Sequence, residues 1–383
     1  MGKIILILLL VCAIFILSCV QNSLGGAITH LPDSFNGSYK IGVMLALTGD
    51  AATYGLPEQQ AIKIAIDEIN FNGGVNGKSL LVVYEDGKCN PKDGNAAAQK
   101  LINIDKVKVI IGGSCSGETL GAAPIAEANK VILISPSSTS PDITNAGDFI
   151  FRVAPSDAKA GIVAADYAFN KLRARKAALI TESADYPQGL RRVFKENFIK
   201  LGGKIASDET YNPEDTDFRT QITKAKASNP DIIYIVPQAP PKGVLLIKQI
   251  KEAGLKQQLL TAEVLIGRNV IEENAGDIEG LIGVEQEFDE TNPKASALFA
   301  KYKKITGEKA PFPTYMAGAY DIVYLIADAV RINGYESERV MNYLYSVKSY
   351  KGALGNITID SYGDPIMDFS VKKVKNGQLV ILT

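Results

Sequence analysis

The amino-acid sequence predicts an α/β protein with two lobes, each a parallel sheet flanked by helices. Two observations support this fold class. From Tyr39 onward, short apolar runs alternate with amphipathic stretches, which is the pattern of repeated βαβ units. After residues 151–153 the same alternation starts again, so the 383-residue chain holds two successive units of similar size.

The first unit contains expected strands separated by expected helices. Residues 58–70 illustrate the reasoning, because Ile62 and Ile66 fall on one side of a helix whereas Lys63 and Asp67 fall on the other. A glycine- and asparagine-rich break, NGGVNG, follows that helix. The expected strands are residues 41–45, 80–85, 107–111 and 131–135, and the expected helices are residues 58–70, 93–104 and 118–127.

The second unit repeats this order and ends in short strands. Its expected strands are residues 177–181, 205–211, 232–236, 259–262 and 280–284, and its expected helices are residues 158–172, 188–201, 218–226 and 243–253. Two further helices are expected at 293–305 and 314–332, followed by strands at 356–359, 369–373 and 379–382. Asn376-Gly377 between the last two strands is a strong hairpin signal.

The N-terminal residues are expected to lie outside the folded lobes. An apolar run at 4–17 is shorter than the roughly 20 residues of a membrane span and fits a signal peptide at 1–18. The sequence ILSC, which ends at Cys19, resembles the lipobox of bacterial lipoproteins. Cys19 is therefore expected to carry lipid, and residues 19–39 to form a flexible tether to the extracytoplasmic or periplasmic face of a membrane. An uncleaved N-terminal anchor is the alternative.

Export also decides how the remaining cysteines are interpreted. Cys89 and Cys115 form an even pair in an oxidising compartment, so a disulfide is expected between them. Residues 113–117 have the form G-x-C-x-G, which with serine at the centre is the nucleophile elbow of hydrolases. The single histidine, His30, lies in the tether, so Cys115 lacks a base and is not expected to be a nucleophile.

Composition and motifs argue against several functional classes. The chain has 41 basic and 42 acidic residues without a basic patch, so nucleic acid is not an expected partner. No phosphate-binding glycine motif follows a strand, and no His/Cys spacing fits a zinc site. No cofactor and no metal are expected. Paired carboxylates for hydrolysis are not singled out by sequence, and an enzyme therefore stays a background alternative.

Polar residues gather where the expected strands end. They include Thr48, Ser114, Ser135, Thr181 and Glu263, which come from both units. In parallel sheets, ligands bind at the carboxyl ends of strands, and clefts between domains are favoured ligand sites. If the two units face each other, these polar groups line one cleft.

Six segments, taken in order, resemble one known family. They are KIGVMLALTGDAATYG, AIDEINFNGGVNGKSL, EDGKCNPKDG, IIGGSCSGETL, ILISPSSTSPDIT and FRVAPSD. Together they resemble the Leu/Ile/Val-binding type of periplasmic solute-binding protein, which delivers branched-chain amino acids to an ABC importer. The resemblance covers the chain from about Tyr39 to Thr383.

The resemblance implies two Rossmann-like lobes that are joined by three hinge crossings and close on a ligand. The crossings are then expected near residues 155–157, 287–289 and 351–355. Lobe one would comprise residues 40–156 and 289–351, and lobe two residues 157–288 and 352–383. That helices 293–332 return to the first lobe rests on the resemblance alone.

The resemblance also implies a set of ligand contacts. Ser116 and Thr139 match the hydroxyls that meet the carboxylate of an amino acid. Glu263 and the backbone carbonyl of Ser137 match the partners of its ammonium group. The remaining matches are two pocket-wall aromatics and a hinge-side acid near the ammonium, namely Tyr54, Tyr186 and Asp157.

Several alternatives stay open at this point. Ser116 and Thr139 are also residues that cap helices, Tyr54 and Tyr186 could be ordinary half-buried aromatics, and Glu263 could be a solvated loop acid. The proline-rich turn at 237–241 departs from the family pattern. Gln238 or Ala239 is a candidate contact there, and the smaller wall could admit a bulkier or different side chain of the ligand. The expected function is capture of an apolar amino acid for an ABC permease and its ATPase. The alternatives are an amide, urea or aromatic carboxylate ligand, or a sensory receptor module.

Overall fold

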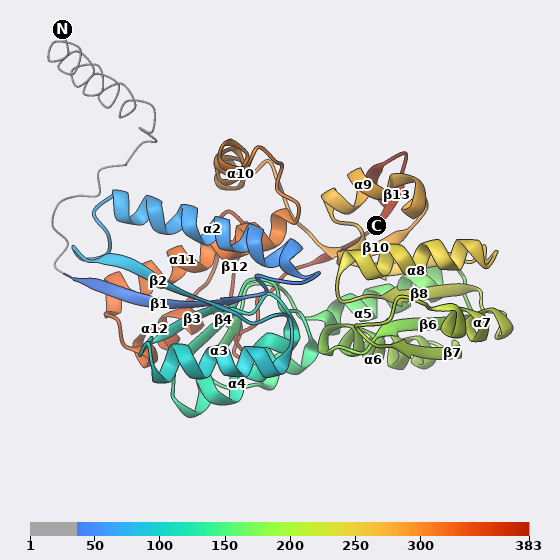
Figure 1. Cartoon of the computed structure of the whole chain (residues 1–383), viewed down its shortest axis with the longest axis horizontal. Coiled ribbons are helices and arrows are strands. Elements are labelled where there is room, and N and C mark those ends of the chain that lie inside the picture. The colour runs from blue at the N-terminus through green and yellow to red at the C-terminus, as the bar shows by residue number, and fades with distance from the viewer. Residues whose placement is uncertain (1–36, 383) are drawn as a thin grey trace, which may run out of the picture.

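The computed structural model describes residues 37–382, which form two lobes lying side by side (Figure 1). The expected signal peptide at 1–18, the expected lipid site at Cys19 and nearly all of the expected tether lie outside the described residues. We call the part built on the five-stranded sheet the first lobe, and the part built on the seven-stranded sheet the second lobe.

The first lobe has a wholly parallel sheet with the strand order β2-β1-β3-β4-β5. Its strands are β1 (Ser38–Leu45), β2 (Ser79–Asp86), β3 (Val109–Gly112), β4 (Ile132–Ser135) and β5 (Ile150–Arg152). The helices that connect them are α2 (Ala52–Phe71), α3 (Pro91–Asn103), α4 (Ser116–Ala128) and the short 3₁₀ helix η1 (Pro141–Asn145).

Alternate residues of β1 enter two different cores, as expected for a sheet covered on both faces. Val43 packs with α2 and the helices that return from the C-terminal part of the chain. Met44 packs on the other face, with α3 and α4. Figure 1 shows α2 and α3 on opposite sides of the sheet.

Three later helices belong to the first lobe. They are α10 (Pro293–Thr306), α11 (Pro313–Asn333) and α12 (Ser337–Ser346). Leu298, Ile322 and Leu344, one from each helix, share a buried cluster with Val43 and Ile62. The chain therefore returns to the first lobe after it has built most of the second.

The second lobe has a mixed sheet with the order β14-β13-β10-β9-β8-β6-β7. The pairs β13–β14 and β13–β10 are antiparallel, and the other pairs are parallel. Its strands are β6 (Lys176–Glu182), β7 (Lys204–Tyr211), β8 (Ile232–Val236), β9 (Gln258–Ala262), β10 (Ile282–Gln286), β13 (Phe369–Lys375) and β14 (Gln378–Ile381). Its helical segments are α5 (Asp157–Asp166), η2 (Tyr167–Lys171), α6 (Asp185–Lys200), α7 (Arg219–Ala227), α8 (Pro240–Glu252), η3 (Glu263–Leu265) and α9 (Arg268–Ile278).

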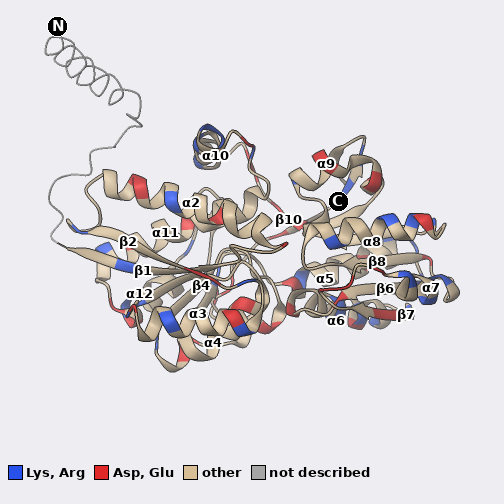
Figure 2. Ribbon diagram, in the orientation of Figure 1, with Lys and Arg blue, Asp and Glu red and all other residues tan. Residues whose placement is uncertain are grey.

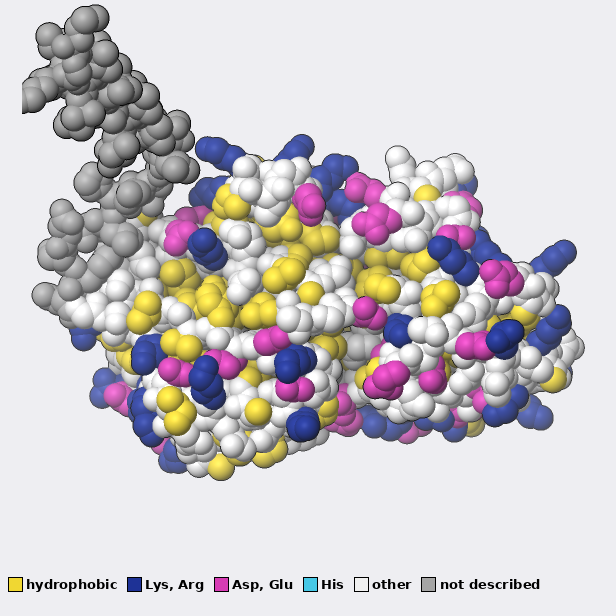
Figure 3. Space-filling model, viewed as in Figure 1, with side chains coloured by type: hydrophobic (Ala, Val, Ile, Leu, Met, Phe, Trp, Pro, Cys, Tyr) yellow, Lys and Arg dark blue, Asp and Glu magenta, His cyan; other side chains and the backbone are white. Residues whose placement is uncertain are grey.

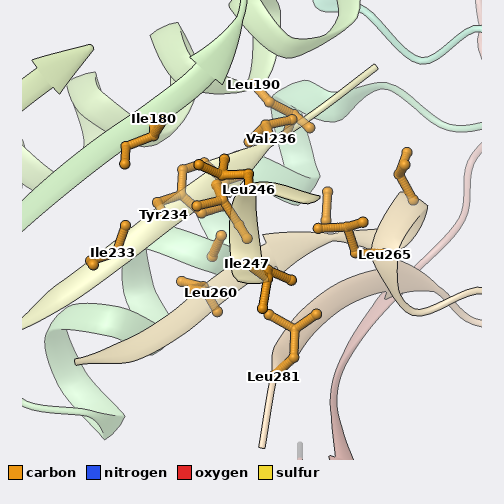
Figure 4. Close-up of a cluster of buried hydrophobic side chains, with 14 of the residues drawn as sticks. Ile180, Leu190, Ile233, Tyr234, Val236, Leu246, Ile247, Leu260, Leu265 and Leu281 are labelled. Atoms are coloured by element: carbon orange, nitrogen blue, oxygen red, sulfur yellow. The ribbon is translucent and has the colours of Figure 1, made fainter. Parts of the chain in front are cut away.

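Two local features of this lobe follow from sequence. Figure 4 shows side chains of β8, β9 and α8 gathered in its core, among them Tyr234, Ile247 and Leu260.

The hairpin between β13 and β14 turns at Asn376 and Gly377, whose φ angles are 52° and 69°. Positive φ at both central residues is what a two-residue hairpin turn requires, and it explains the Asn-Gly pair.

The third crossing lies later than expected, which corrects one lobe boundary. The sequence analysis assigned residues 352–383 to the second lobe, but Ala353, Leu354 and Ile357 are buried in the core of the first. The short strands β11 (Tyr350–Lys351) and β12 (Asn356–Ile357) also pair there. The Asp321 carboxylate accepts the backbone N–H groups of Ala353 and Leu354, both at 2.7 Å, which fixes this segment to α11. The chain enters the second lobe close to Asp368, whose carbonyl accepts the N–H of Glu287 at 2.8 Å.

Charged residues of both signs are interspersed along the two lobes (Figure 2). Figure 3 shows both signs over most of the face in view and a group of basic side chains over α10. Within residues 37–382, no helix has the length and apolar character needed to cross a membrane. The same residues hold no group of three or more His, Cys, Asp or Glu side chains suited to a metal ion.

Candidate ligand site between the lobes

Residues of both lobes line a cavity of about 20 Å³. The first lobe contributes residues that follow β3 and β4, together with Tyr54 of α2 and Tyr315 of α11. The second lobe contributes residues that follow β8 and β9, together with Tyr186 of α6. The full lining is Tyr54, Ser114, Cys115, Ser116, Ser137, Thr139, Tyr186, Gln238, Glu263, Val264 and Tyr315.

The two lobes touch across this cavity. The hydroxyl of Tyr54 donates to the carbonyl of Gln238 at 3.3 Å. The hydroxyl of Tyr315 donates to Oε1 of Glu263 at 2.9 Å. In both pairs the tyrosine belongs to the first lobe and its partner to the second, so the structure shows the lobes in a closed arrangement.

One side of the cavity is formed by the turn that follows β3. Helix α4 begins at Ser116, so its unpaired N–H groups and the positive end of its dipole lie at the cavity. The Ser116 hydroxyl accepts the N–H of Ser140 at 3.0 Å, which leaves its own hydrogen free to donate. Among residues 37–382, no Lys or Arg lines the cavity. This side therefore suits an anion bound by neutral donors.

Neither Ser116 nor Thr139 is a helix cap. The N-cap of α4 is Cys115, and the N-cap of η1 is Ser140. Ser116 is the first helical residue, and Thr139 precedes the cap by one position. The capping alternative for these two hydroxyls is therefore wrong.

The turn itself is held by a disulfide and a buried carboxylate. Cys89 and Cys115 are bonded, with their Cα atoms 5.1 Å apart, which confirms the expected pairing. The Glu118 carboxylate accepts the N–H groups of both cysteines at 2.9 Å. Gly112 has a φ of 144°, and a Cβ there would lie 1.8 Å from the carbonyl oxygen of Met44. Only glycine fits at that position.

The opposite side of the cavity carries Glu263. This residue follows β9 as the first residue of η3, and it is partly buried. Burial raises the pKa of its carboxyl above the ordinary range. Because a cationic ligand group would offset the cost of burying this charge, this side suits an ammonium group.

Asp157 lies behind the cavity and is not part of its lining. Its N–H donates to the carbonyl of Thr139 at 2.8 Å, and within residues 37–382 its Oδ2 has no hydrogen-bond partner. Burial, followed by the nearby Glu263 carboxylate, raises the pKa of Asp157 well above its usual range. The carboxyl groups of Asp157 and Glu263 thus lie near each other at this end of the site.

The walls of the cavity are aromatic. Tyr54 packs edge-on against Phe312, with ring centroids 4.7 Å apart, and also against Tyr315 at 6.1 Å. Tyr186 is buried to 4% exposure. Gln238 closes the wall on the side of the second lobe, where its N–H donates to Glu182 at 2.9 Å.

The last two residues of the proline-rich turn begin a helix. The sequence predicts a helix from residue 243, but α8 begins at Pro240 and its N-cap is Ala239. Proline is favoured in the first helical turn, where its missing N–H is not needed. Only Gln238 of this turn lines the cavity.

The structure brings together six of the seven residues expected to contact a ligand: Ser116, Ser137, Thr139, Glu263, Tyr54 and Tyr186. Ser114 was expected among the polar groups at the strand ends, but Val264 and Tyr315 were not expected from the sequence. Val264 directly follows the expected contact Glu263 and could have been found by extending that strand end by one position. No sequence signal identifies Tyr315, because its helix comes from a distant part of the chain.

Comparison with known proteins adds independent findings. Residues 38–378 match a family described as periplasmic binding protein. The chain is 32% identical over 335 residues to the leucine-, isoleucine-, valine-, threonine- and alanine-binding protein of Pseudomonas aeruginosa, covering 87% of this chain and 88% of that protein.

Solved structures agree on the fold. A leucine-binding protein from Thermotoga maritima superposes with a TM-score of 0.82 at 30% identity, covering 90% of this chain and 98% of that one. The solute-binding protein of an ABC transporter from R. palustris, in complex with benzoate, has a TM-score of 0.80 at 21% identity, covering 90% of this chain and 96% of that one. At that identity the second likeness shows the fold alone.

Proposed function

Because the chain belongs to the periplasmic binding protein family, we propose that it captures an α-amino acid with a branched-chain or other apolar side chain between its lobes. It is a solute-binding protein of the branched-chain amino acid transporter type, and such proteins are not enzymes. The family also implies an extracytoplasmic location. An ABC permease with its ATPase is the proposed recipient of the ligand.

The proposal that the ligand is an amino acid rests on the polarity of the cavity. Ser116, with the N-terminus of α4, lies on one side, and Glu263 lies on the other. An α-amino acid is a zwitterion and needs an anion-binding half and a cation-binding half in one small space. The absence of Lys and Arg from the lining is consistent with a carboxylate bound by hydroxyl and N–H donors.

Each half of the ligand is assigned its own contacts. The carboxylate is proposed to accept from Ser116 and Thr139. The ammonium is proposed to donate to Glu263 and to the carbonyl of Ser137, with Asp157 behind. The hydroxyl of Ser137 faces Glu58, at 2.5 Å, so the backbone is the group that Ser137 offers to a ligand. Tyr54 and Tyr186 are proposed to enclose the aliphatic side chain.

An aromatic carboxylate is the second candidate ligand. Three tyrosines line the cavity, namely Tyr54, Tyr186 and Tyr315, and aromatic rings pack well against one another. The benzoate complex of the R. palustris protein shows that this fold can hold such a ligand. Benzoate has no ammonium group, however, and would leave Glu263 without a cationic partner.

Titration calorimetry on protein freed of ligand by unfolding and refolding tests this proposal. The panel is L-leucine, L-isoleucine, L-valine, L-alanine, L-phenylalanine, benzoate and an aliphatic amide. Binding of one or more of the amino acids, with benzoate and the amide much weaker, supports the proposal. Tight binding of benzoate or the amide with no amino acid bound would contradict it.

Lipid anchoring at Cys19 is proposed on the sequence ILSC, which lies outside the described residues. Several acyl chains on one cysteine hold a protein at a membrane surface far better than one chain does. Changing Cys19→Ala should move the protein from the membrane fraction to the soluble fraction. A variant that remains in the membrane fraction would instead indicate an uncleaved N-terminal anchor.

A further inference from the structure

Glu58 is a fully buried carboxyl group directly beneath the cavity. It lies on α2, one helical turn after Tyr54, and has no exposed surface. Its Oε2 lies 2.6 Å from the hydroxyl of Ser114, and its Oε1 lies 2.5 Å from the hydroxyl of Ser137. Both serines line the cavity, one in the turn after β3 and the other in the turn after β4. Glu58 therefore joins the two turns that are proposed to bind the ligand's carboxylate.

The hydrogens available for these hydrogen bonds indicate whether the neutral or the ionised carboxyl of Glu58 fits. The Ser137 hydroxyl lies near two acceptors, Glu58 at 2.5 Å and the carbonyl of Ser114 at 2.9 Å, but it has only one hydrogen. If Glu58 is protonated on Oε1, it donates to Ser137, and Ser137 then donates to the carbonyl of Ser114. Ser114 in turn accepts the N–H of Ala46 at 3.2 Å and donates to Oε2. With the neutral acid, every group in this chain of hydrogen bonds has a partner.

The charged surroundings favour the same form. Within residues 37–382, Glu58 forms no ion pair. The groups that face it are the hydroxyls of Ser114 and Ser137 and, from α4, the carboxyl of Glu118. From its own helix, the phenol of Tyr54 interacts with the Glu58 charge. Burial raises the pKa of Glu58 to about 8, against the opposing effect of the two serine hydroxyls.

We propose that Glu58 is a positioning residue that holds the Ser114 and Ser137 turns in their binding geometry as a neutral acid and keeps negative charge away from the ligand's carboxylate. This inference deepens the proposed function, on which it rests only for the presence of a carboxylate in the ligand. Loss of the proton would place a buried negative charge behind the two turns that carry Ser116 and Thr139, the proposed contacts of that carboxylate. Binding of any carboxylate ligand should therefore favour the protonated form of Glu58.

A first experiment needs no ligand, because Glu58, Ser114 and Ser137 all belong to the first lobe. E58Q keeps the shape of the acid and a donor toward Ser137, but it does not ionise. In the parent, the folded pKa of about 8 exceeds the ordinary value of 4.5. The stabilising contribution of the neutral acid is therefore complete below the unfolded pKa and lost as the pH rises through about 8.

The melting temperature of the parent, measured against that of E58Q, should consequently fall as the pH rises from about 5 to about 9. Other titrating groups are common to both proteins and cancel in this difference. Glu68→Gln is the control on the same helix, because Glu68 pairs with Lys301 and its pKa is lowered. Melting curves of the parent and E58Q that stay parallel over this range would overturn the proposal.

A second experiment measures binding of L-leucine and benzoate by the parent and E58Q between about pH 7 and pH 9. Relative to that of E58Q, the affinity of the parent should fall toward the one-proton limit of about tenfold per pH unit. Glu263 and Asp157, which also have raised pKa values, are common to both proteins and cancel in this ratio. If E58Q does not fold, the net proton uptake of the parent on binding tests the same role of Glu58. Calorimetric titration of the parent in buffers of different ionisation enthalpy measures this uptake. A parallel loss of affinity in both proteins, or no proton uptake, would overturn the role of Glu58.

The two ligands separate this inference from the proposed function. Both carry a carboxylate, so Glu58 should affect both. If benzoate binds and no amino acid of the panel does, the amino-acid proposal fails and the Glu58 proposal is still tested. If no ligand of the panel binds at any pH, the proposed function fails, and the ligand-free melting experiment alone decides the state of Glu58.

Discussion

The hydroxyl of Tyr315 donates a 2.9 Å hydrogen bond to the carboxyl of Glu263 across the boundary between the lobes. Tyr315 lies on α11, which returns to the first lobe, and Glu263 follows β9 of the second. The acid proposed to bind the ligand's ammonium is therefore also held by the opposite lobe. Closure of the lobes and orientation of Glu263 depend on the same contact.

Tyr315→Phe should weaken binding of an amino acid by about tenfold or more, because a hydrogen bond to a charged group contributes about 1.5–3 kcal/mol. Calorimetric titration with the tightest amino acid of the panel measures the change. Tyr320→Phe is the matched control on the same helix, since its hydroxyl donates to Glu68 at 2.6 Å, away from the cavity. Equal losses in the two variants, or none in Tyr315→Phe, would contradict the proposed contact.

The importance of Tyr315 shows where sequence reasoning reaches its limit. Parallel strands that are buried on both faces appear as continuous apolar runs, so β1, β3, β4 and β8 could be located. Helical spacing, however, does not tell which sheet a helix packs on, so the return of α10 and α11 required a family resemblance. The short strand β5 has only three residues, too few for a periodic signal, and it was not expected.

Some residues of the site could also be predicted from the sequence, and others could not. Residues next to strand ends, such as Ser116 and Glu263, could be proposed because parallel sheets direct their ligands there. Glu58 could not, because the expected helix began at Glu58, whereas α2 begins at Ala52 and places this glutamate in its buried interior. A glutamate in an amphipathic pattern is ordinarily assigned to solvent, and only the positions of Ser114 and Ser137 in space reveal its role.

Removing the disulfide should lower stability substantially without changing the fold. The bond between Cys89 and Cys115 spans a sequence separation of 26 residues. The chain-entropy model gives about 3.5 kcal/mol for a loop of this length. The double variant Cys89→Ser/Cys115→Ser should lose about that much free energy of unfolding in a denaturant titration. Uptake of an alkylating label by both cysteines in non-reduced parent protein from an oxidising compartment would contradict the bonded state.

The buried ion pair between Arg152 and Asp364 should be sensitive to loss of one partner. Arg152 has no exposed surface, and its Nε lies 2.6 Å from Asp364. Asp364→Asn should lower the free energy of unfolding by about 3–5 kcal/mol, because it leaves a buried charge uncompensated. Asp217→Asn, at the exposed pair with Arg219, is the control and should leave the melting temperature almost unchanged. Similar melting temperatures for the two variants would contradict this account.

Glu263→Gln tests which class of ligand the cavity accepts. Truncating one partner of a buried charge pair costs about 2–5 kcal/mol, since the other charge is left unpaired. An α-amino acid should therefore bind Glu263→Gln about 30-fold or more weakly than the parent. The ligand-free protein should keep its melting temperature, because the glutamine amide can still accept from Tyr315 and carries no charge that needs to be buried.

Glu285→Gln is the matched control for this variant. Glu285 lies on the neighbouring strand β10, and its carboxylate pairs with Lys372 at 2.7 Å instead of lining the cavity. The same change of charge in the same lobe should leave amino-acid affinity near that of the parent. Benzoate, which has no ammonium group, should bind Glu263→Gln at least as well as it binds the parent, because a buried negative charge has been removed. If the physiological ligand binds Glu263→Gln as tightly as it binds the parent, the cavity does not recognise an ammonium group, and an aromatic carboxylate or an amide becomes the better explanation of the site.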